Sequence, residues 1–508
     1  MRISIASPAE AQQLSVDELM AESDPMGQVN SVNQLTDISP SDWAFQAVKN
    51  MVERYQCLEG YPDQTFRGNR PVTRFEFAAA LNACLDRVLE IVGGEEGITP
   101  EDFATLRALV EEFEGELAVL RGRVDDLEAR TAQLEANQFS TTTKLRGETI
   151  FTVADTFGDR IGTDNDDSQT IFGYRVRLNF DTSFTGKDRL RARLQARDIP
   201  NFNGSTGTDE SRLGYDGDSD AVFELDDLHY RFPVGSNIRV YVAAQSFEFR
   251  DFGNTLAPFV SSGSGALSRF GRLNPIMRQS DDGVGLGVEL NLGKFGVDLG
   301  YLAIEEAANP AEKNGLFNGA YGAFANAVYE FSDSFAFGVF YQHYFAPGGQ
   351  VNVFGSTGTD FAQQPFGSNV ATSSDSVGAQ AEANLGSFVF GGWVGYTWAD
   401  ANDPVDNIDD LSAEALNWGV QLGLKDLAIE GSLLGIVVGQ PPYTTDNDLA
   451  ARDDSEVDGS TFHVEAFYRI PINDNLEITP GAFVIFNPES NSDNDEIVVG
   501  AIRATFEF

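Results

Sequence analysis

Apolar and polar residues alternate through most of the chain after residue 144. The pattern is clearest in residues 172–181, where aromatic and aliphatic side chains alternate with glycine, arginine, asparagine and aspartate. Residues 189–197 repeat it, with leucine and alanine placed between arginines and a glutamine. A period of two with one apolar and one charged face is typical of a strand that has lipid on one side and water on the other.

Sixteen segments share this period. They cover residues 145–154, 170–184, 188–198, 223–233, 237–247, 283–292, 295–304, 319–331, 335–346, 376–386, 388–398, 415–424, 427–438, 461–471, 476–486 and 496–508. Tight turns follow every second segment, at 185–187, 235–236, 292–294, 332–334, 385–387, 425–426 and 473–475, and longer loops fill the other gaps. An even number of strands with short turns at one end and long loops at the other is the pattern of bacterial outer-membrane barrels.

A soluble β-sandwich is the alternative, and it would show strands of about five or six residues and a dry inner face. The strands here are longer and carry arginines on one face. We therefore predict a membrane all-β fold for residues 144–508, an antiparallel transmembrane β-barrel of about sixteen strands. The alternation from Val498 to the terminal Phe508 also resembles the C-terminal signal read by the outer-membrane insertion machinery of bacteria.

Residues 98–140 have a heptad period instead. The a positions are Phe103, Val110, Leu117, Val124, Thr131 and Gln138, and the d positions are Leu106, Phe113, Leu120, Leu127 and Leu134. Residues at the flanking g and e positions, five apart, have opposite charges, as in Glu116 and Arg121. Such residues form ion pairs between two identical helices only if the helices run parallel. We predict a parallel coiled-coil stalk of about 50 Å, with a lone amphipathic helix as the alternative. Valine at a with leucine at d favours dimers by the usual rule, so the heptads leave dimer or trimer open.

Helical periodicity in residues 32–92 predicts a small all-α domain. One helix is expected from Ser41 through Glu53, and a second begins at Thr73, where Glu76 completes a capping box. Residues 1–31 are expected to be disordered or the remnant of a leader, because the apolar core of a signal peptide is missing. No run of apolar residues reaches the length of about 18 that a transmembrane helix needs.

The net charge of −44 argues against nucleic acid as a partner, because so acidic a chain repels the phosphate backbone. Most of the excess acid lies in the long loops, for example in residues 164–167, 400–410 and 453–458. Two interpretations stay open: these acids keep the protein soluble, or they form a negative outer mouth that concentrates cations. No loop has the ligand spacing of a calcium site, and we predict no metal site and no cofactor.

Six arginines lie on the polar faces of the second and third predicted strands: Arg175, Arg177, Arg189, Arg191, Arg193 and Arg197. Facing lipid would cost about 2–4 kcal/mol for each near the bilayer midplane, so we predict that they line the pore. They need screening by water or by acids of an inward loop. The longest loop, Phe249 to Asp282, is expected to fold inward and form a constriction, with Asp251, Asp281 and Asp282 as its candidate acids. The arginines would either set ion selectivity or form a structural salt-bridge lattice.

The sequence shows no catalytic set. His229, His343 and His463 are scattered among the strands, and each is expected to be a lumen or girdle residue rather than a base. Because no nucleophile is paired with a histidine, we predict that the protein is not an enzyme.

One run within residues 32–92 carries a family resemblance. It comprises Asp37, Trp43-Ala44, Ala47-Val48, Gly60-Tyr61-Pro62-Asp63, Thr65-Phe66-Arg67 and Asn69 through Phe77. The run resembles an S-layer homology (SLH) domain. Followed by a coiled coil and a barrel, it is similar to the SLH-containing porins of cyanobacterial outer membranes, whose barrels belong with the OprB-type and iron uptake porins.

This resemblance implies a periplasmic domain that binds polysaccharide attached to peptidoglycan, often through pyruvylated sugars. Arg74 would bind a carboxylate, Trp43 would line the sugar site, and Thr73 and Glu76 would shape the helix start beside it. Gln64 departs from the pattern, which usually has glycine there. This chain has one SLH module, whereas wall-anchoring proteins commonly have three. A homotrimer, which is the state of this family's porins, would bring three modules together.

We therefore predict an outer-membrane porin for passive diffusion of small solutes, above all inorganic ions, that is anchored to the peptidoglycan layer. The alternatives are a structural tether between membrane and wall with a nearly closed barrel, and a carbohydrate- or iron-selective uptake porin. Cys57 closes the first predicted helix and Cys84 lies in the second. In an oxidising periplasm they would form a disulfide or remain as two packed thiols.

Overall fold

The computed structural model describes residues 31–40, 45–58, 64–66, 80, 84, 87, 142–304, 307–454 and 459–508. The chain divides into two compact units, Met1–Glu135 and Ala136–Phe508, and each is described by itself. The predicted leader remnant, the coiled-coil stalk and nearly all of the second predicted helix lie outside the described residues. Within those residues, no helix is long and apolar enough to cross a membrane.

The N-terminal unit has a small apolar core. Its described elements are η1 (Val32–Gln34), α2 (Phe45–Lys49) and η2 (Asn50–Arg54). The helix expected to end at Glu53 is observed as α2 followed by a wider, π-helical turn in which Tyr55 N donates to Asn50 O at 2.9 Å. Val32, Leu35, Val48 and Val52 form the buried cluster of this unit.

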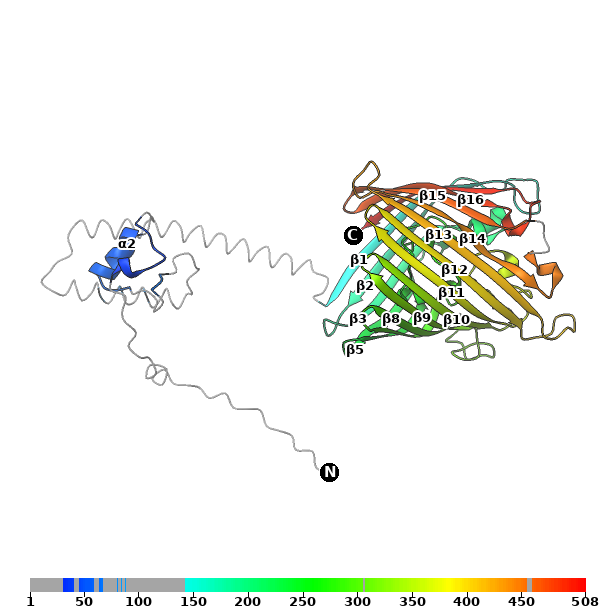
Figure 1. Ribbon diagram of the computed structural model, residues 1–508, viewed down its shortest axis with the longest axis horizontal. Helices are drawn as coiled ribbons and strands as arrows, with labels where there is room; N and C mark the ends of the chain where they lie inside the picture. The colour runs from blue at the N-terminus through cyan, green and yellow to red at the C-terminus, as the bar shows by residue number, and fades with distance from the viewer. Residues whose placement is uncertain are drawn as a thin grey trace, which may run out of the picture. The chain divides into compact units, whose positions relative to one another are not determined.

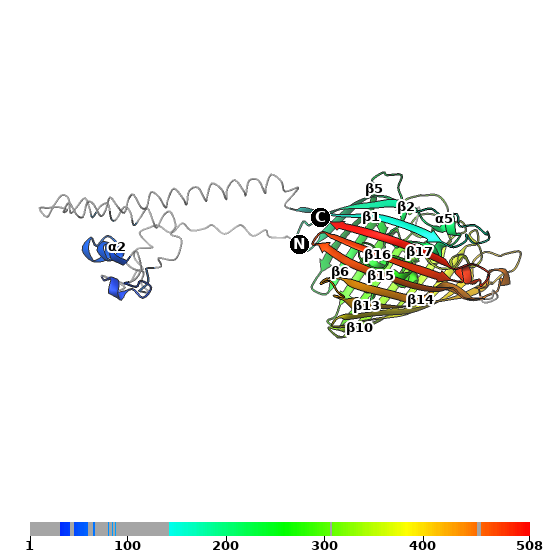
Figure 2. The ribbon, with the colours of Figure 1, turned by 90° about the horizontal axis from the view of Figure 1, so that it is seen from above.

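The second unit is a closed barrel (Figures 1 and 2). Its wall strands are β1 (Thr143–Phe157), β2 (Ile171–Thr182), β3 (Arg189–Ile199), β5 (Glu224–Val234), β6 (Ile238–Phe247), β7 (Gly283–Asn291), β8 (Phe295–Ala303), β9 (Tyr321–Ser332), β10 (Phe335–Ala346), β11 (Thr372–Leu385), β12 (Phe388–Ala401), β13 (Ser412–Lys425), β14 (Leu433–Asn447), β15 (Phe462–Asn473), β16 (Leu476–Phe486) and β17 (Ile497–Glu507). Each wall strand pairs antiparallel with its neighbours, and β17 returns to β1 with Glu507 opposite Glu148. The two-residue strand β4 (Gly217–Asp218) pairs only with the end of β3. The predicted barrel of sixteen strands is confirmed.

Alternation of the side chains follows the predicted period of two. On β12, Phe388, Phe390 and Trp398 are exposed on the outer face, whereas Trp393 and Thr397 are buried on the inner face. Outward apolar side chains such as these suit contact with lipid. The strands satisfy one another's backbone groups around a barrel with no edge, as a lipid environment requires.

The turn before β14 was predicted incorrectly. We expected a strand over residues 427–438 after a tight turn at 425–426, but β14 begins at Leu433 and runs to Asn447. The reason is a local loop closed by Asp426, whose Oδ1 accepts from Gly431 N at 2.7 Å while its own N donates to Ser432 O at 2.9 Å. Gly431 has φ +79°, which favours glycine.

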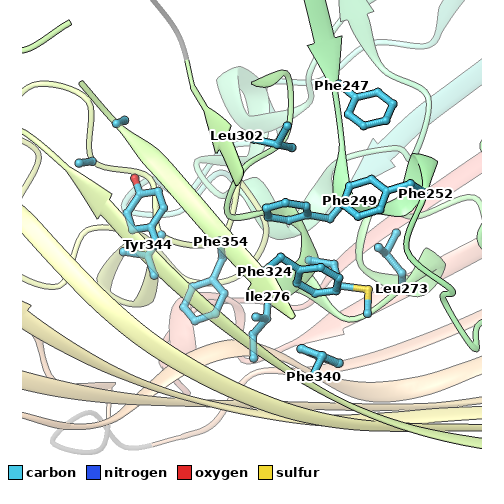
Figure 3. Close-up of a cluster of buried hydrophobic side chains, with 14 of the residues drawn as sticks. Phe247, Phe249, Phe252, Leu273, Ile276, Leu302, Phe324, Phe340, Tyr344 and Phe354 are labelled. Carbon is cyan, nitrogen blue, oxygen red and sulfur yellow. The ribbon is translucent and has the colours of Figure 1, made fainter. Parts of the chain in front are cut away.

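The β6–β7 loop, residues 248–282, lies inside the barrel, and we call it the inner loop. Figure 3 shows Phe249, Phe252, Leu273 and Ile276 of this loop packed with Phe324 and Phe340 of the barrel wall. The rings of Phe249 and Phe324 stack with centroids 4.6 Å apart. An apolar core therefore fills one side of the barrel interior instead of water.

Candidate pore constriction

The inner loop is fastened to strands on several sides of the barrel. Arg503 of β17 donates to Ser262 O at 3.0 Å and to Gly265 O at 2.8 Å. Gln421 of β13 donates to Gly271 O at 2.6 Å. These contacts join residues more than a hundred positions apart, and the inner loop consequently crosses the lumen as a fixed element rather than as a free surface loop.

The C-terminal end of the inner loop is fastened to β10 and β11. Gln279 donates to Ser376 Oγ at 3.0 Å, and Gln342 donates to Ser280 Oγ at 3.1 Å. On β12, a Cβ added to Gly391 would lie 2.5 Å from Pro258 Cδ, so this strand needs glycine for the loop to approach.

Two of the six candidate arginines contact the inner loop directly. Arg175 donates to Ser262 Oγ at 2.9 Å and forms an ion pair with Glu148 at 2.6 Å. Arg177 donates to Gln195 Oε1 at 2.5 Å and lies 3.4 Å from Ser262 Oγ. Among the described residues, no carboxylate lies within ion-pair distance of Arg177. Its guanidinium is held by Gln195 and the inner loop instead.

The other arginines on β3 lie among acids of the neighbouring strands. Arg191 binds Asp181 at 2.7 Å and 2.8 Å through two nitrogens. Arg193 lies 3.2 Å from Asp226 and 3.6 Å from Asp227. Arg189 contacts His229, and Arg197 donates to the backbone oxygen of Asp216.

This arrangement corrects the expected source of screening. We expected water or acids of an inward loop to screen the arginines, but the direct ion-pair partners Glu148, Asp181, Asp226 and Asp227 stand on β1, β2 and β5. Side chains opposite one another on paired strands lie about 5 Å apart, which is close enough for an ion pair. The alternation of β2 puts Asp181 on the polar face and could have identified it, whereas consecutive Asp226 and Asp227 both reach Arg193 beside a register shift that no alternation predicts.

The three candidate acids of the inner loop have different surroundings. Asp281 lies 3.3 Å from Arg250, 3.5 Å from Arg269 and 3.3 Å from Arg278. Asp251 accepts from Glu248 N at 3.0 Å, which closes a capping box at the start of the short helix η4 (Phe249–Asp251). Asp282 adopts φ +62°, where the chain leaves the loop to enter β7.

A polar cavity of about 660 Å³ opens at the short-turn end of the barrel. It lies between the start of the inner loop and β6–β9, and its charged lining comprises Arg239, Arg250, Asp251, Glu289, Asp298 and Glu330. Side chains of both signs line this space, and such a lining suits hydrated ions and polar solutes.

The structure brings one serine next to a histidine, which sequence reasoning missed. Ser268 Oγ of the inner loop lies 3.2 Å from His463 Nε2, and it contacts Glu465 Oε2 at 2.5 Å. In a nucleophilic triad the carboxylate orients the histidine from its other nitrogen, whereas Glu465 here binds the serine. All three residues are buried, and we interpret them as an anchor of the inner loop.

The candidate wall-binding residues Trp43, Thr73, Arg74 and Glu76 lie outside the described residues. Cys57 and Cys84 are joined by a disulfide bond in the structure. In the described part of the chain, no group of three or more histidine, cysteine, aspartate or glutamate side chains is arranged to hold a metal ion.

A closed barrel of sixteen antiparallel strands with a loop folded into its lumen defines a porin of the bacterial outer membrane. Residues 100–508 match the carbohydrate-selective porin family OprB, and the chain belongs to this family. Residues 34–78 match the S-layer homology domain. The resemblance inferred from the sequence is thereby confirmed, as is the outer-membrane location.

Two relatives match nearly the whole chain. A protein of Synechocystis sp., described as uncharacterized, is 37% identical over 540 residues, which cover 100% of this chain and 98% of the relative. A second uncharacterized protein, from Nostoc sp., is 40% identical over 514 residues, covering 95% of this chain and 86% of the relative. Among solved structures, the high-pH structure of Pseudomonas putida OprB matches with a TM-score of 0.51 at 13% identity, covering 75% of this chain and 97% of that one. At this identity the structural match supports the fold alone.

Proposed function

We propose that this protein is a trimeric pore for the passive diffusion of small polar solutes, above all inorganic ions. The observation that carries the proposal is the polar cavity of about 660 Å³ beside the inner loop, which is lined by charges of both signs. Solute passage tests it: reconstituted protein should give ohmic current steps in KCl, and the absence of steps would contradict a pore.

The arginines of β2 and β3 are proposed to set the ion preference of this pore. Arg177 has no carboxylate partner among the described residues, and it lies at the inner loop where the lumen is narrowed. Arg191 pairs with Asp181 and Arg193 pairs with Asp226, and these ion pairs hold the four charged side chains at fixed positions. Fixed charges along a narrow polar path discriminate between anions and cations.

Carbohydrate uptake is a second candidate, which the description of the matching family favours. Current measurements with added sugars distinguish a pore for inorganic ions from a pore for carbohydrate uptake. A sugar that binds in the lumen should reduce the KCl current in a concentration-dependent way, whereas a pore without sugar preference should respond only to the change in bulk conductivity.

The N-terminal unit is proposed to anchor the barrel to the cell wall. The match of residues 34–78 to the S-layer homology domain supports this, with Trp43, Thr73, Arg74 and Glu76 as the proposed contacts to peptidoglycan-linked, pyruvylated polysaccharide. Deleting residues 32–92 should abolish sedimentation with purified peptidoglycan and leave conductance unchanged. Retained sedimentation would contradict the anchoring role.

The contacts of the inner loop also favour a third candidate, a tether with a nearly closed barrel. The loop is fastened on several sides, and apolar cores occupy much of the interior. Single-channel recording separates this candidate from an open pore, because a plugged barrel gives no ohmic steps while still sedimenting with peptidoglycan.

A further inference from the structure

Two glutamates from different loops lie against each other at the long-loop end of the barrel. Glu210 belongs to the β3–β5 loop and Glu489 to the β16–β17 loop, and Glu489 N donates to Glu210 Oε2 at 2.8 Å. Thr208 Oγ1 lies 2.5 Å from Glu489 Oε1 and 3.4 Å from Glu210 Oε2. One hydroxyl therefore bridges the two carboxyl groups.

The same two carboxyl groups hold two more loops. Thr461, at the end of the β14–β15 loop, donates its hydroxyl to Glu210 Oε1. Asp360 of the β10–β11 loop donates its backbone N–H to Glu489 Oε2 at 2.6 Å. Glu489 itself has φ +56°, a conformation that non-glycine residues rarely adopt and that surrounding contacts must maintain. We call Glu210, Glu489 and these contacts the carboxyl clasp.

Positive charge is missing from the clasp. Among the described residues, no lysine, arginine or histidine lies within ion-pair distance of either glutamate. Charged and titratable groups on the packed elements are Asp209, Arg212, Asp360, Arg452, Asp453, Asp454 and His463, of which Arg212 pairs with Asp216, Arg452 pairs with Asp360, and His463 faces Ser268. Burial raises the pKa of Glu210 to about 7, and burial together with the charge of Glu210 raises the pKa of Glu489.

A single proton can satisfy this geometry. With Glu489 protonated, its O–H donates to Thr208 Oγ1, and the threonine hydrogen then points to Glu210 Oε2. Two ionised carboxylates that share one hydroxyl would repel each other, and the described residues place no cation beside them to compensate. The clasp is therefore held only while the pair keeps at least one proton.

The loops of the clasp also hold the inner loop. Leu213, three residues after Glu210, forms a β-bridge with Ser268, and Gly214 N donates to Leu267 O at 2.7 Å. Arg269 donates to Gly355 O of the β10–β11 loop at 2.8 Å. Loosening the clasp would thus remove support from two segments that position the inner loop.

We propose that the carboxyl clasp is a proton-dependent latch on the outer loops, which loosens when the Glu210–Glu489 pair loses its proton and lets the inner loop move. Movement of the inner loop would change the current only if the barrel is the pore proposed above. Loosening of the outer loops does not depend on that proposed function.

The direction of the pH dependence follows from the raised pKa. A closed clasp binds its protons more tightly than an open one, so the clasp is most stable below the ordinary glutamate pKa of about 4.5 and weakens as the pH rises through the raised pKa values of Glu210 and Glu489.

Hydrogen exchange on the full-length protein tests the latch. Peptides from the β3–β5 and β16–β17 loops should exchange at least about tenfold faster at about pH 8 than at about pH 5, after correction for the intrinsic exchange rate. In Glu489→Gln, the amide nitrogen can donate to Thr208 Oγ1 while its oxygen accepts from Asp360 N, so this variant should show no such increase. Glu210→Gln is a second variant with the same expectation.

Asp493→Asn is the matched control, because it removes one exposed carboxylate from the same loop without touching the clasp. It should behave like the natural protein. Equal exchange at both pH values in the natural protein, or an equal increase in both glutamine variants, would overturn the proposal.

Current measured at the same two pH values adds an independent readout. Mean conductance, corrected for the conductivity of the buffer, should change with pH in the natural protein and in Asp493→Asn but stay constant in Glu489→Gln. Loss of all current at every pH would contradict the proposed pore, while the exchange result would still decide the clasp.

Discussion

The double substitution Arg191→Ser and Arg193→Ser tests the proposed role of the inner-face arginines in ion selectivity. Arg191 lies 2.7 Å from Asp181 and Arg193 lies 3.2 Å from Asp226. Removing both guanidinium groups therefore takes away two positive charges and leaves three carboxylates, Asp181, Asp226 and Asp227, without these partners. The lumen beside β3 becomes more negative by two charges.

The size of the effect follows from Coulomb's law. A charge about 8 Å from the path of an ion contributes about 0.5 kcal/mol in water, and screening in 0.1 M salt reduces this to about 0.25 kcal/mol. Two charges then stabilise a cation and destabilise an anion by about 0.5 kcal/mol each, which raises the cation-to-anion permeability ratio about fivefold. Across a roughly tenfold KCl gradient, the reversal potential should move toward the cation value by about 30 mV.

Planar-bilayer recording measures this shift directly. The control variant, Arg191→Lys with Arg193→Lys, keeps the charge and loses only the fork geometry of arginine, so its reversal potential should stay near that of the natural protein. An unchanged reversal potential in the serine variant, with the barrel still folded by circular dichroism, would refute the reasoning and leave the arginines as a structural lattice.

Three further predictions concern stability. Arg503→Ala removes a buried donor to two backbone carbonyls of the inner loop, and it should lower the unfolding free energy by about 1.5–3 kcal/mol in urea titrations and increase open-channel noise. Phe249→Ala empties the centre of the apolar core beside the inner loop and should cost about 3–5 kcal/mol in the same titration, whereas Phe172→Ala, on the exposed outer face, should cost clearly less. Replacing Cys57 and Cys84 by serine removes a disulfide that spans 27 residues and should destabilise the N-terminal unit by about 3 kcal/mol. Mass spectrometry of the natural protein without reduction checks the disulfide, and a mass that corresponds to two free thiols would contradict it.

The strands could be predicted because their signal is local. On β2 and β3, each residue's face follows from its position in the alternation, since lipid and water select opposite side chains at successive positions. The predicted start of β14 was wrong because the same local signal continues into a loop. Residues 427–432 alternate too, but hydrogen bonds of Asp426 close a local loop that periodicity does not reveal.

The location of the inner loop could be expected from its length, but its contacts could not. Its fastening depends on pairs such as Ser262 with Arg503 and Gly271 with Gln421, which are far apart in the chain and adopt partners only after the barrel has closed. The same applies to Glu210 and Glu489, which as single acids in polar loops give no sign that they meet.

The sequence by itself therefore determined the barrel, its sixteen strands and the family to which it belongs, because alternation and short motifs are properties of neighbouring residues. Only the tertiary structure decided that the arginines pair with acids of adjacent strands, that an apolar core fills part of the lumen, and that two glutamates share one site. Those features depend on closure of the sheet, which brings β17 beside β1 and places distant loops in contact at its ends.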